Sequence, residues 1–174
     1  SSLPVTAVSS KPATIDFELP ALDMVDHTGK KFSNQDLVGK VTVVDFIFTT
    51  CGSVCPRLTK TMSEFAKGYA QDGQVAFVSI TVDPENDTPD KLAAFASPYG
   101  VDPARWRFLT GEPNHVEQTV VKGFKMALRP AGPNVIDHSE RFVVVDPRGR
   151  VRGVFETDEA GLAKLAQAIV ELKP

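Results

Sequence analysis

The stretch VTVVDFIF, residues 41–48, constrains the fold more strongly than any other part of the sequence. It is a nearly continuous run of β-branched and aromatic side chains, which is typical of a strand buried on both faces of a sheet. A second run of this kind follows at residues 74–83. Between the two runs, apolar residues recur at helical spacing from residue 56 to about residue 69. We therefore expect a strand–helix–strand unit at the centre of the chain.

The segments that follow continue the alternation of strands and helices. A helix is expected after Asp87 or Thr88, either of which could cap it, with Pro89 at its first position. Further expected elements are a strand at 105–110, a short helix at 112–124, a long irregular loop at 125–140, a hairpin at 141–156 and a terminal helix at 158–173. Strands that alternate with helices and then form a hairpin predict a mixed sheet covered on both faces.

The N-terminal part is expected to extend this domain without forming its centre. Residues 1–14 are rich in Ser, Pro, Ala and Thr and lack periodicity, so we expect a mobile arm or the remnant of a tether. Residues 15–40 predict two short strands about the turn HTGK and a short helix that Ser33 or Asn34 would open. The order of elements resembles the thioredoxin-like fold. We thus expect a single α/β domain over residues 15–174, with an N-terminal strand extension.

Cys51 and Cys55 are the two cysteines of the chain, and they lie where the first buried strand gives way to the predicted helix. A spacing of four residues places both side chains on one face of a helical turn, near enough for the sulfurs to meet each other or one ion. The helix N-terminus favours the thiolate, which attacks disulfides and binds metals. The cysteines alone leave open a redox pair, part of a metal site, or a passive pair of buried side chains or disulfide.

A metal site needs a further ligand, and the chain has three histidines. His27 lies in a polar turn and His115 at the start of a polar helix, so we expect both to be solvated surface side chains. His138 ends the long loop, immediately before a buried strand. In a thioredoxin-like sheet this junction faces the cysteine turn, although a loop histidine is by itself more often a surface side chain than a ligand.

Composition excludes some classes of partner. A chain of 174 residues can bury a proper core, and its net charge of −3 gives no sign of a nucleic-acid surface. We find no apolar stretch of the roughly 18–20 residues that a membrane span requires, and no signal peptide. The sequence begins at Ser1 without Met, which is compatible with removal of a leader or an anchor helix.

The motifs together resemble the Sco/SenC family of copper proteins, which assist assembly of the copper centre of cytochrome c oxidase. The resemblance covers roughly residues 15–172, and it rests on a strand ending in TTC, the pattern C-x-x-x-C-P, the segment TVDPENDTP, and DHS before FVVVDPRGRV. It implies that Cys51, Cys55 and His138 are copper ligands. Two thiolates and an imidazole suit Cu(I) and are acceptable to Cu(II), whereas structural zinc normally has four protein ligands.

Near the implied site, one pair of residues departs from the family pattern, and one acidic segment matches it. The family usually has Pro-Asp after its first cysteine, where this chain has Gly52 and Ser53. Asp83, Glu85 and Asp87 lie in a segment typical of the family, but a turn and a helix cap account for them locally. We expect no catalytic role for these carboxylates.

The resemblance also implies a function, partners and a location. It implies a monomeric metallochaperone that passes copper to a subunit of cytochrome c oxidase or another cuproprotein, with a thiol reductant protein as second partner. The implied location is periplasmic or on the extracytoplasmic side of a membrane, or the mitochondrial intermembrane space, with an anchor outside this chain. The alternative is a thiol–disulfide oxidoreductase, in which Cys51 attacks a target disulfide and Cys55 resolves the mixed disulfide.

Overall fold

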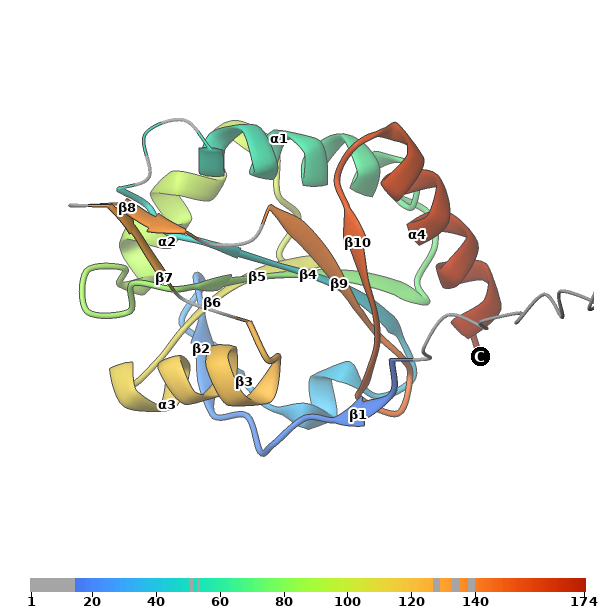
Figure 1. Ribbon diagram of the computed structural model, residues 1–174, viewed down its shortest axis with the longest axis horizontal. Helices are drawn as coiled ribbons and strands as arrows, with labels where there is room; N and C mark the ends of the chain where they lie inside the picture. The colour runs from blue at the N-terminus through green and yellow to red at the C-terminus, as the bar shows by residue number, and fades with distance from the viewer. Residues whose placement is uncertain (1–14, 51, 53, 127–128, 133–134, 138–139) are drawn as a thin grey trace, which may run out of the picture.

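The computed structural model describes residues 15–174, except for residues 51, 53, 127–128, 133–134 and 138–139. Two of the expected ligands, Cys51 and His138, and the expected arm at residues 1–14 therefore lie outside the described residues. The described part forms a curled, mixed sheet with helices on both faces (Figure 1). This arrangement confirms the expected α/β class.

Eight strands form the main sheet, and its centre is parallel. The order across the sheet is β1 (Phe17–Glu18), β10 (Arg150–Glu156), β9 (Arg141–Val145), β4 (Val41–Ile47), β5 (Val75–Thr81), β6 (Trp106–Thr110), β2 (Met24–Asp26) and β3 (Lys31–Phe32). Strands β4, β5 and β6 run parallel to one another, and the other neighbouring strands pair antiparallel. Strand β4 lies inside the sheet, as its uninterrupted apolar sequence predicts.

The expectation of an irregular loop over residues 125–140 is wrong in part. This segment contains β7 (Arg129–Gly132) and β8 (Val135–Asp137), which pair with each other in a separate two-stranded sheet. Strands of three or four residues are too short to show an alternating pattern, and the glycine and prolines of this segment are typical of loops. The sequence therefore gave no signal for them.

The helices form two layers. Figure 1 shows α1 (Val54–Lys67), α2 (Pro89–Ala96) and α4 (Glu159–Leu172) on one side of the sheet, and α3 (Pro113–Gln118) and the 3₁₀ turn η1 (Asn34–Leu37) on the other. A second 3₁₀ turn, η2 (Ser97–Tyr99), follows α2, and a π-helical turn, η3 (Thr119–Gly123), follows α3. Among these described helices, none has the length and apolar character needed to cross a membrane.

Side chains of β4 alternate between two apolar layers. Val44 and Phe46 pack on the side of α3 and η1, whereas Val43 and Ile47 pack on the side of α1, α2 and α4. All residues of this strand are buried. Because both faces of β4 are covered, the strand gives a rigid starting point for the cysteine turn that follows its carboxyl end.

Asp45 is a carboxylic acid inside this apolar strand. Its side chain accepts a hydrogen bond from the Ser79 hydroxyl of β5, which in turn accepts one from the Trp106 indole N–H of β6 at 3.0 Å. The second carboxyl oxygen, Oδ2, has no hydrogen-bond partner within the described residues. Burial raises the pKa of Asp45 to about 7, although the hydrogen bond from Ser79 opposes this shift.

We predict that Asp45→Asn changes the pH dependence of stability. The folded protein holds the Asp45 proton up to a pKa of about 7, against an ordinary value of 3.8. The wild-type free energy of unfolding should therefore fall as pH rises from about 4 to about 7. Asparagine does not ionise, so the variant should lack this loss. The free energy of unfolding of the variant minus that of wild type should therefore rise by roughly 2–4 kcal/mol from pH 4 to pH 8.

Urea unfolding of both proteins at pH 4, 6 and 8 measures this difference. Glu64→Gln provides a matched control, because Glu64 is exposed on α1 and its removal should leave the pH profile unchanged. If the Asp45→Asn and wild-type profiles run parallel over this range, Asp45 is not a buried acid of raised pKa.

Candidate metal centre

Cys55 lies in the first turn of α1 and is completely buried. Its side chain belongs to the apolar layer that also contains Ile47 of β4 and Leu58 of α1. The first turn of a helix presents backbone N–H groups without intrahelical acceptors and carries partial positive charge. Cys55 is thus shielded from water on the sheet side, at a helix end that favours a thiolate.

Tyr99 lies beside this turn, in a position that no sequence pattern predicts. Its hydroxyl donates a hydrogen bond to the Pro56 carbonyl at 3.3 Å, and its own carbonyl accepts one from the Ser63 hydroxyl at 3.2 Å. Burial, followed by the negative charge of Cys55, raises the pKa of Tyr99. The phenol therefore remains a neutral donor at physiological pH and ties η2 to the first half of α1.

Asp87 holds the segment that leads into the cysteine turn. Its buried carboxylate accepts hydrogen bonds from the backbone N–H of Thr49 at 3.1 Å, from the Thr49 hydroxyl, and from the Thr81 hydroxyl at 2.6 Å. Thr49 lies two residues before Cys51 in the sequence. A carboxylate with three donors is well satisfied, and removing it would leave buried donors without partners.

This arrangement shows that Asp87 does not cap a helix, as the sequence had allowed, whereas Asp83 forms the expected turn. The cap of α2 is Thr88, whose side chain accepts from the Lys91 N–H, so Asp87 is not a helix cap. Asp83 forms a local turn, in which its carboxylate accepts from the Asn86 side chain at 3.0 Å. Glu85 is exposed.

The sheet brings the region before β9 to the cysteine turn. Strand β9 pairs antiparallel with β4, with Val143 opposite Val44, so the amino end of β9 lies at the carboxyl end of β4. At this edge, Nη2 of Arg57 and Oε1 of Glu140 form an ion pair at 2.9 Å. Both side chains are exposed, so the pair contributes little stability. It shows, however, that the first turns of α1 and the segment before β9 are in contact.

The ion pair joins the surroundings of the expected ligands. Arg57 follows Cys55 by two residues, and Glu140 follows His138 by two residues. Within the described residues, no group of three histidine, cysteine or acidic side chains is suitably placed to hold a metal ion. Cys51 and His138 are not among those residues, so the complete ligand set stays a prediction.

His27 and His115 have structural roles that the sequence did not reveal. Nδ1 of His27 accepts a hydrogen bond from the Phe108 N–H at 3.2 Å, and Nε2 of His115 accepts one from the Asp23 N–H at 3.0 Å. Both side chains are half-buried, and burial lowers the pKa of His27. They are therefore hydrogen-bond acceptors within the fold rather than merely solvated surface side chains.

Gly52 occupies a position that does not require glycine. Its φ is not positive, and a Cβ added there would meet no atom of the described residues within 4 Å. The departure from Pro-Asp at this position is therefore not imposed by backbone strain or by crowding.

Known proteins match most of this chain. The family model described as SCO1/SenC matches residues 12–173. A SCO1 protein homolog of Bacillus subtilis is 35% identical over 140 residues, which cover 79% of this chain and 72% of the relative.

Solved structures have the same fold. A SCO1/SenC family lipoprotein from Bacillus anthracis superposes with a TM-score of 0.83 at 27% identity, over 93% of this chain and 98% of that one. BsSco is a member of the Sco family of cytochrome c oxidase assembly proteins in which a disulfide switch has been identified. It superposes with a TM-score of 0.81 at 29% identity, over 92% of this chain and 95% of that one. Bradyrhizobium japonicum ScoI, solved with copper bound, gives 0.75 at 24% identity, over 90% and 99%, and supports the fold alone.

The family model spans nearly the whole chain, and the thioredoxin-like folds of these relatives superpose on the same mixed sheet. The cysteine turn, the TVDPENDTP segment and the entrance to β9 meet at one edge of that sheet. On this evidence, the chain belongs to the SCO1/SenC family.

Proposed function

We propose that this protein is a copper metallochaperone, in which Cys51, Cys55 and His138 bind one copper ion for delivery to a subunit of cytochrome c oxidase or another cuproprotein. The observation that carries the proposal is the ion pair between Arg57 and Glu140. It links the helix turn that contains Cys55 to the segment that follows His138, although the two segments are far apart in sequence.

The donor set fits copper better than the alternatives. Two thiolates and one imidazole nitrogen are soft to borderline ligands, which Cu(I) accepts in three-coordinate geometry and Cu(II) tolerates. A structural zinc site would require a fourth protein ligand, and calcium or magnesium would require oxygen ligands. Three ligands also leave room for a donor from the receiving protein, as transfer of a bound ion requires.

The surrounding residues would hold the donors in place. Asp87 fixes Thr49 at the start of the cysteine turn, and Tyr99 fixes the first residues of α1 through the Pro56 carbonyl. Residues that orient metal ligands in this way affect metal affinity although they do not touch the ion. We therefore assign positioning roles to Asp87 and Tyr99.

The relatives support the kind of partner and the location. One belongs to a family of cytochrome c oxidase assembly proteins, and one is a lipoprotein. We infer an extracytoplasmic location and a cuproprotein as recipient. Because copper binding requires thiolates, a thiol reductant protein is a further partner.

A second candidate function is thiol–disulfide exchange, which the disulfide switch described for BsSco favours. In that reaction the Cys51 thiolate attacks a target disulfide and releases one thiolate of the target. Cys55 then displaces the other target sulfur, so that the target gains two electrons and this chain keeps a disulfide. Reductase turnover by the copper-free protein separates this function from metal delivery.

We predict that the three proposed ligands differ in their effect on Cu(I) and Cu(II). Cys51→Ser and Cys55→Ser should abolish tight binding of both ions, because each removes a thiolate. His138→Ala should retain most Cu(I) affinity, since two thiolates can hold Cu(I) in near-linear geometry, but should lose Cu(II) affinity by about tenfold or more. Competition titrations of the reduced protein with chromophoric chelators measure both affinities.

His115→Ala is the matched control for these titrations. It removes a histidine that accepts a backbone hydrogen bond elsewhere in the fold, so both copper affinities should equal those of wild type. An unaltered Cu(II) affinity in His138→Ala would refute the ligand assignment. Rapid disulfide reduction by a wild-type protein that binds no copper would favour the second function.

A further prediction concerns Asp87→Asn. The substitution keeps the size of the side chain but removes its charge and one acceptor oxygen, so a donor from Thr49 or Thr81 loses its partner. We expect a loss of about 2 kcal/mol in the free energy of unfolding, together with weaker copper binding. Glu85→Gln, an exposed neighbour, should change stability by no more than about 0.5 kcal/mol. Urea unfolding and copper titration of both variants test this, and equal behaviour of the two would remove Asp87 from the positioning role.

A further inference from the structure

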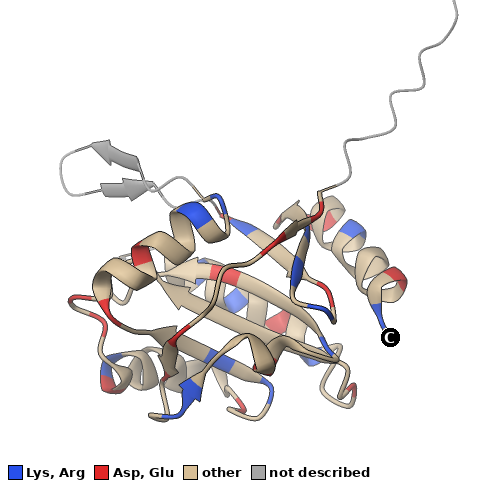
Figure 2. Cartoon of the chain, turned by 90° about the horizontal axis from the view of Figure 1, so that it is seen from below, with Lys and Arg blue, Asp and Glu red and all other residues tan. Residues whose placement is uncertain are grey.

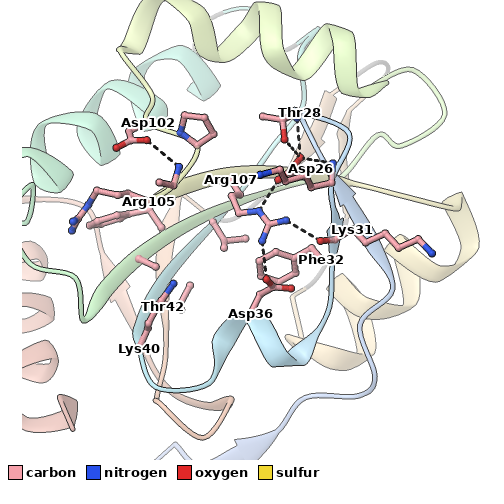
Figure 3. A pocket seen from close by; sticks show the side chains of 16 residues that line it. Asp26, Thr28, Lys31, Phe32, Asp36, Lys40, Thr42, Asp102, Arg105 and Arg107 are labelled. Carbon is pink, nitrogen blue, oxygen red and sulfur yellow. Dashed lines mark hydrogen bonds and ion pairs between the residues drawn. The ribbon is translucent and has the colours of Figure 1, made fainter.

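A cavity of about 590 Å³ lies at the amino ends of the parallel strands, at the end of the sheet opposite to the cysteine turn (Figure 3). Thr42 of β4, Ala76 of β5 and Arg107 of β6 line it, and each is the second residue of its strand. Because β4 and β5 have seven residues each, at about 3.3 Å per residue, roughly 16 Å separates Thr42 and Ala76 from the carboxyl ends of their strands. The cavity is therefore distinct from the candidate metal centre.

The floor of the cavity contains a polar group without a partner. Thr42 is only 1% exposed, yet its hydroxyl makes no hydrogen bond within the described part of the chain. Buried hydroxyl groups are nearly always paired, because an unpaired one costs about 1–3 kcal/mol. A ligand seated on the floor beside Ala76 would offer the missing partner.

Arg107 supplies rigid donors in the wall of the same cavity. Its guanidinium lies over the Phe32 ring, 4.7 Å from the centroid. It donates from Nε to Asp26 at 2.7 Å, from Nη1 to Asp36 at 3.0 Å, and from Nη2 to the Lys31 carbonyl at 2.9 Å. A guanidinium has five N–H groups, so two remain without an acceptor among the described residues. These donors are fixed before any ligand arrives.

Basic side chains outnumber acidic ones in the lining of the cavity, which contains Lys30, Lys31, Lys40, Arg105 and Arg107 against Asp26, Asp36 and Asp102. The three lysines form the rim, and none of them forms an ion pair with another described residue. The carboxylates of Asp26 and Asp36 are engaged by Arg107. Elsewhere in the described part, charges of both signs are interspersed, as the view in Figure 2 shows. The local excess of lysine therefore favours an anion at this cavity in particular.

Much of the remaining lining is apolar or small, with contributions from Ala76, Val78, Pro103 and Ala104. A volume of this size is typical of small-molecule sites, which combine an apolar lining with a few placed polar groups. We propose that the cavity binds a small organic oxyanion, meaning a carboxylate or phosphate group attached to a compact apolar body. The oxyanion would meet the lysine rim and the free donors of Arg107, and the body would lie on the floor beside Thr42.

Amide chemical-shift titration of the reduced, copper-free chain tests this proposal. Benzoate and phenyl phosphate carry both required features, whereas inorganic phosphate lacks the apolar body and benzyl alcohol lacks the charge. We expect saturable shifts around residues 40–42, 76–78 and 102–107 with benzoate or phenyl phosphate, and weaker binding of the other two probes. The tighter of the two oxyanions identifies the head group. Shifts that do not saturate, or that arise elsewhere, would overturn the proposal.

Variants test the same site without relying on copper. Thr42→Val should weaken probe binding about fivefold, the factor of one neutral hydrogen bond. It should not lower the thermal midpoint, because the lost hydroxyl has no hydrogen-bond partner among the described residues. Lys40→Met, on the rim, should also weaken binding. Thr59→Val is the matched control, since Thr59 of α1 lies outside the cavity lining and its buried hydroxyl also finds no hydrogen-bond partner in the described part of the chain. Wild-type affinity in both Thr42→Val and Lys40→Met would contradict the site.

Discussion

The antiparallel pairing of β9 with β4 is the constraint on which the candidate metal centre depends. It places the amino end of β9 at the carboxyl end of β4, so that residues as far apart in sequence as Arg57 and Glu140 meet at one edge. The parallel pairing of β4 with β5 adds the segment around Asp87 to the same edge. Three loops therefore converge because of strand direction alone, before any side chain contributes.

The interior of the sheet and its two ends have different chemical characters. Asp45, Ser79 and Trp106 connect three parallel strands through polar groups inside an apolar layer. The carboxyl ends carry Cys55 at a helix N-terminus, which suits a thiolate and a soft metal ion. At the amino ends, Lys40 before β4 and Arg107 of β6 lie with Lys30 and Lys31 of the β2–β3 hairpin, and these basic groups suit an oxyanion. The two sites that we propose thus lie at opposite ends of the same three strands and have opposite preferences.

Local sequence patterns predicted the elements of this fold well. The long apolar runs gave β4 and β5, and Thr88 and Asp158 cap helices where the sequence predicts helix starts. These features depend on neighbours in sequence, which is why a single chain reveals them. The short strands β7 and β8 escaped prediction because they pair only with each other and are too short to show a period.

The site was only partly predictable for a related reason. Cys51, Cys55 and His138 were selected by spacing and by resemblance, but the roles of Asp87 and Tyr99 depend on contacts with residues far away in sequence. The same holds for the ion pair between Arg57 and Glu140 and for the unpaired hydroxyl of Thr42. Only the three-dimensional packing brings these groups together or leaves one without a partner.

X-ray absorption spectroscopy of the copper-loaded, reduced protein tests the central claim most directly, because it reports the atoms bound to the ion. Our account predicts two sulfur ligands and one imidazole nitrogen, with loss of the nitrogen contribution alone in His138→Ala. A spectrum with fewer than two sulfur ligands, or an imidazole contribution that persists unchanged in His138→Ala, would contradict it.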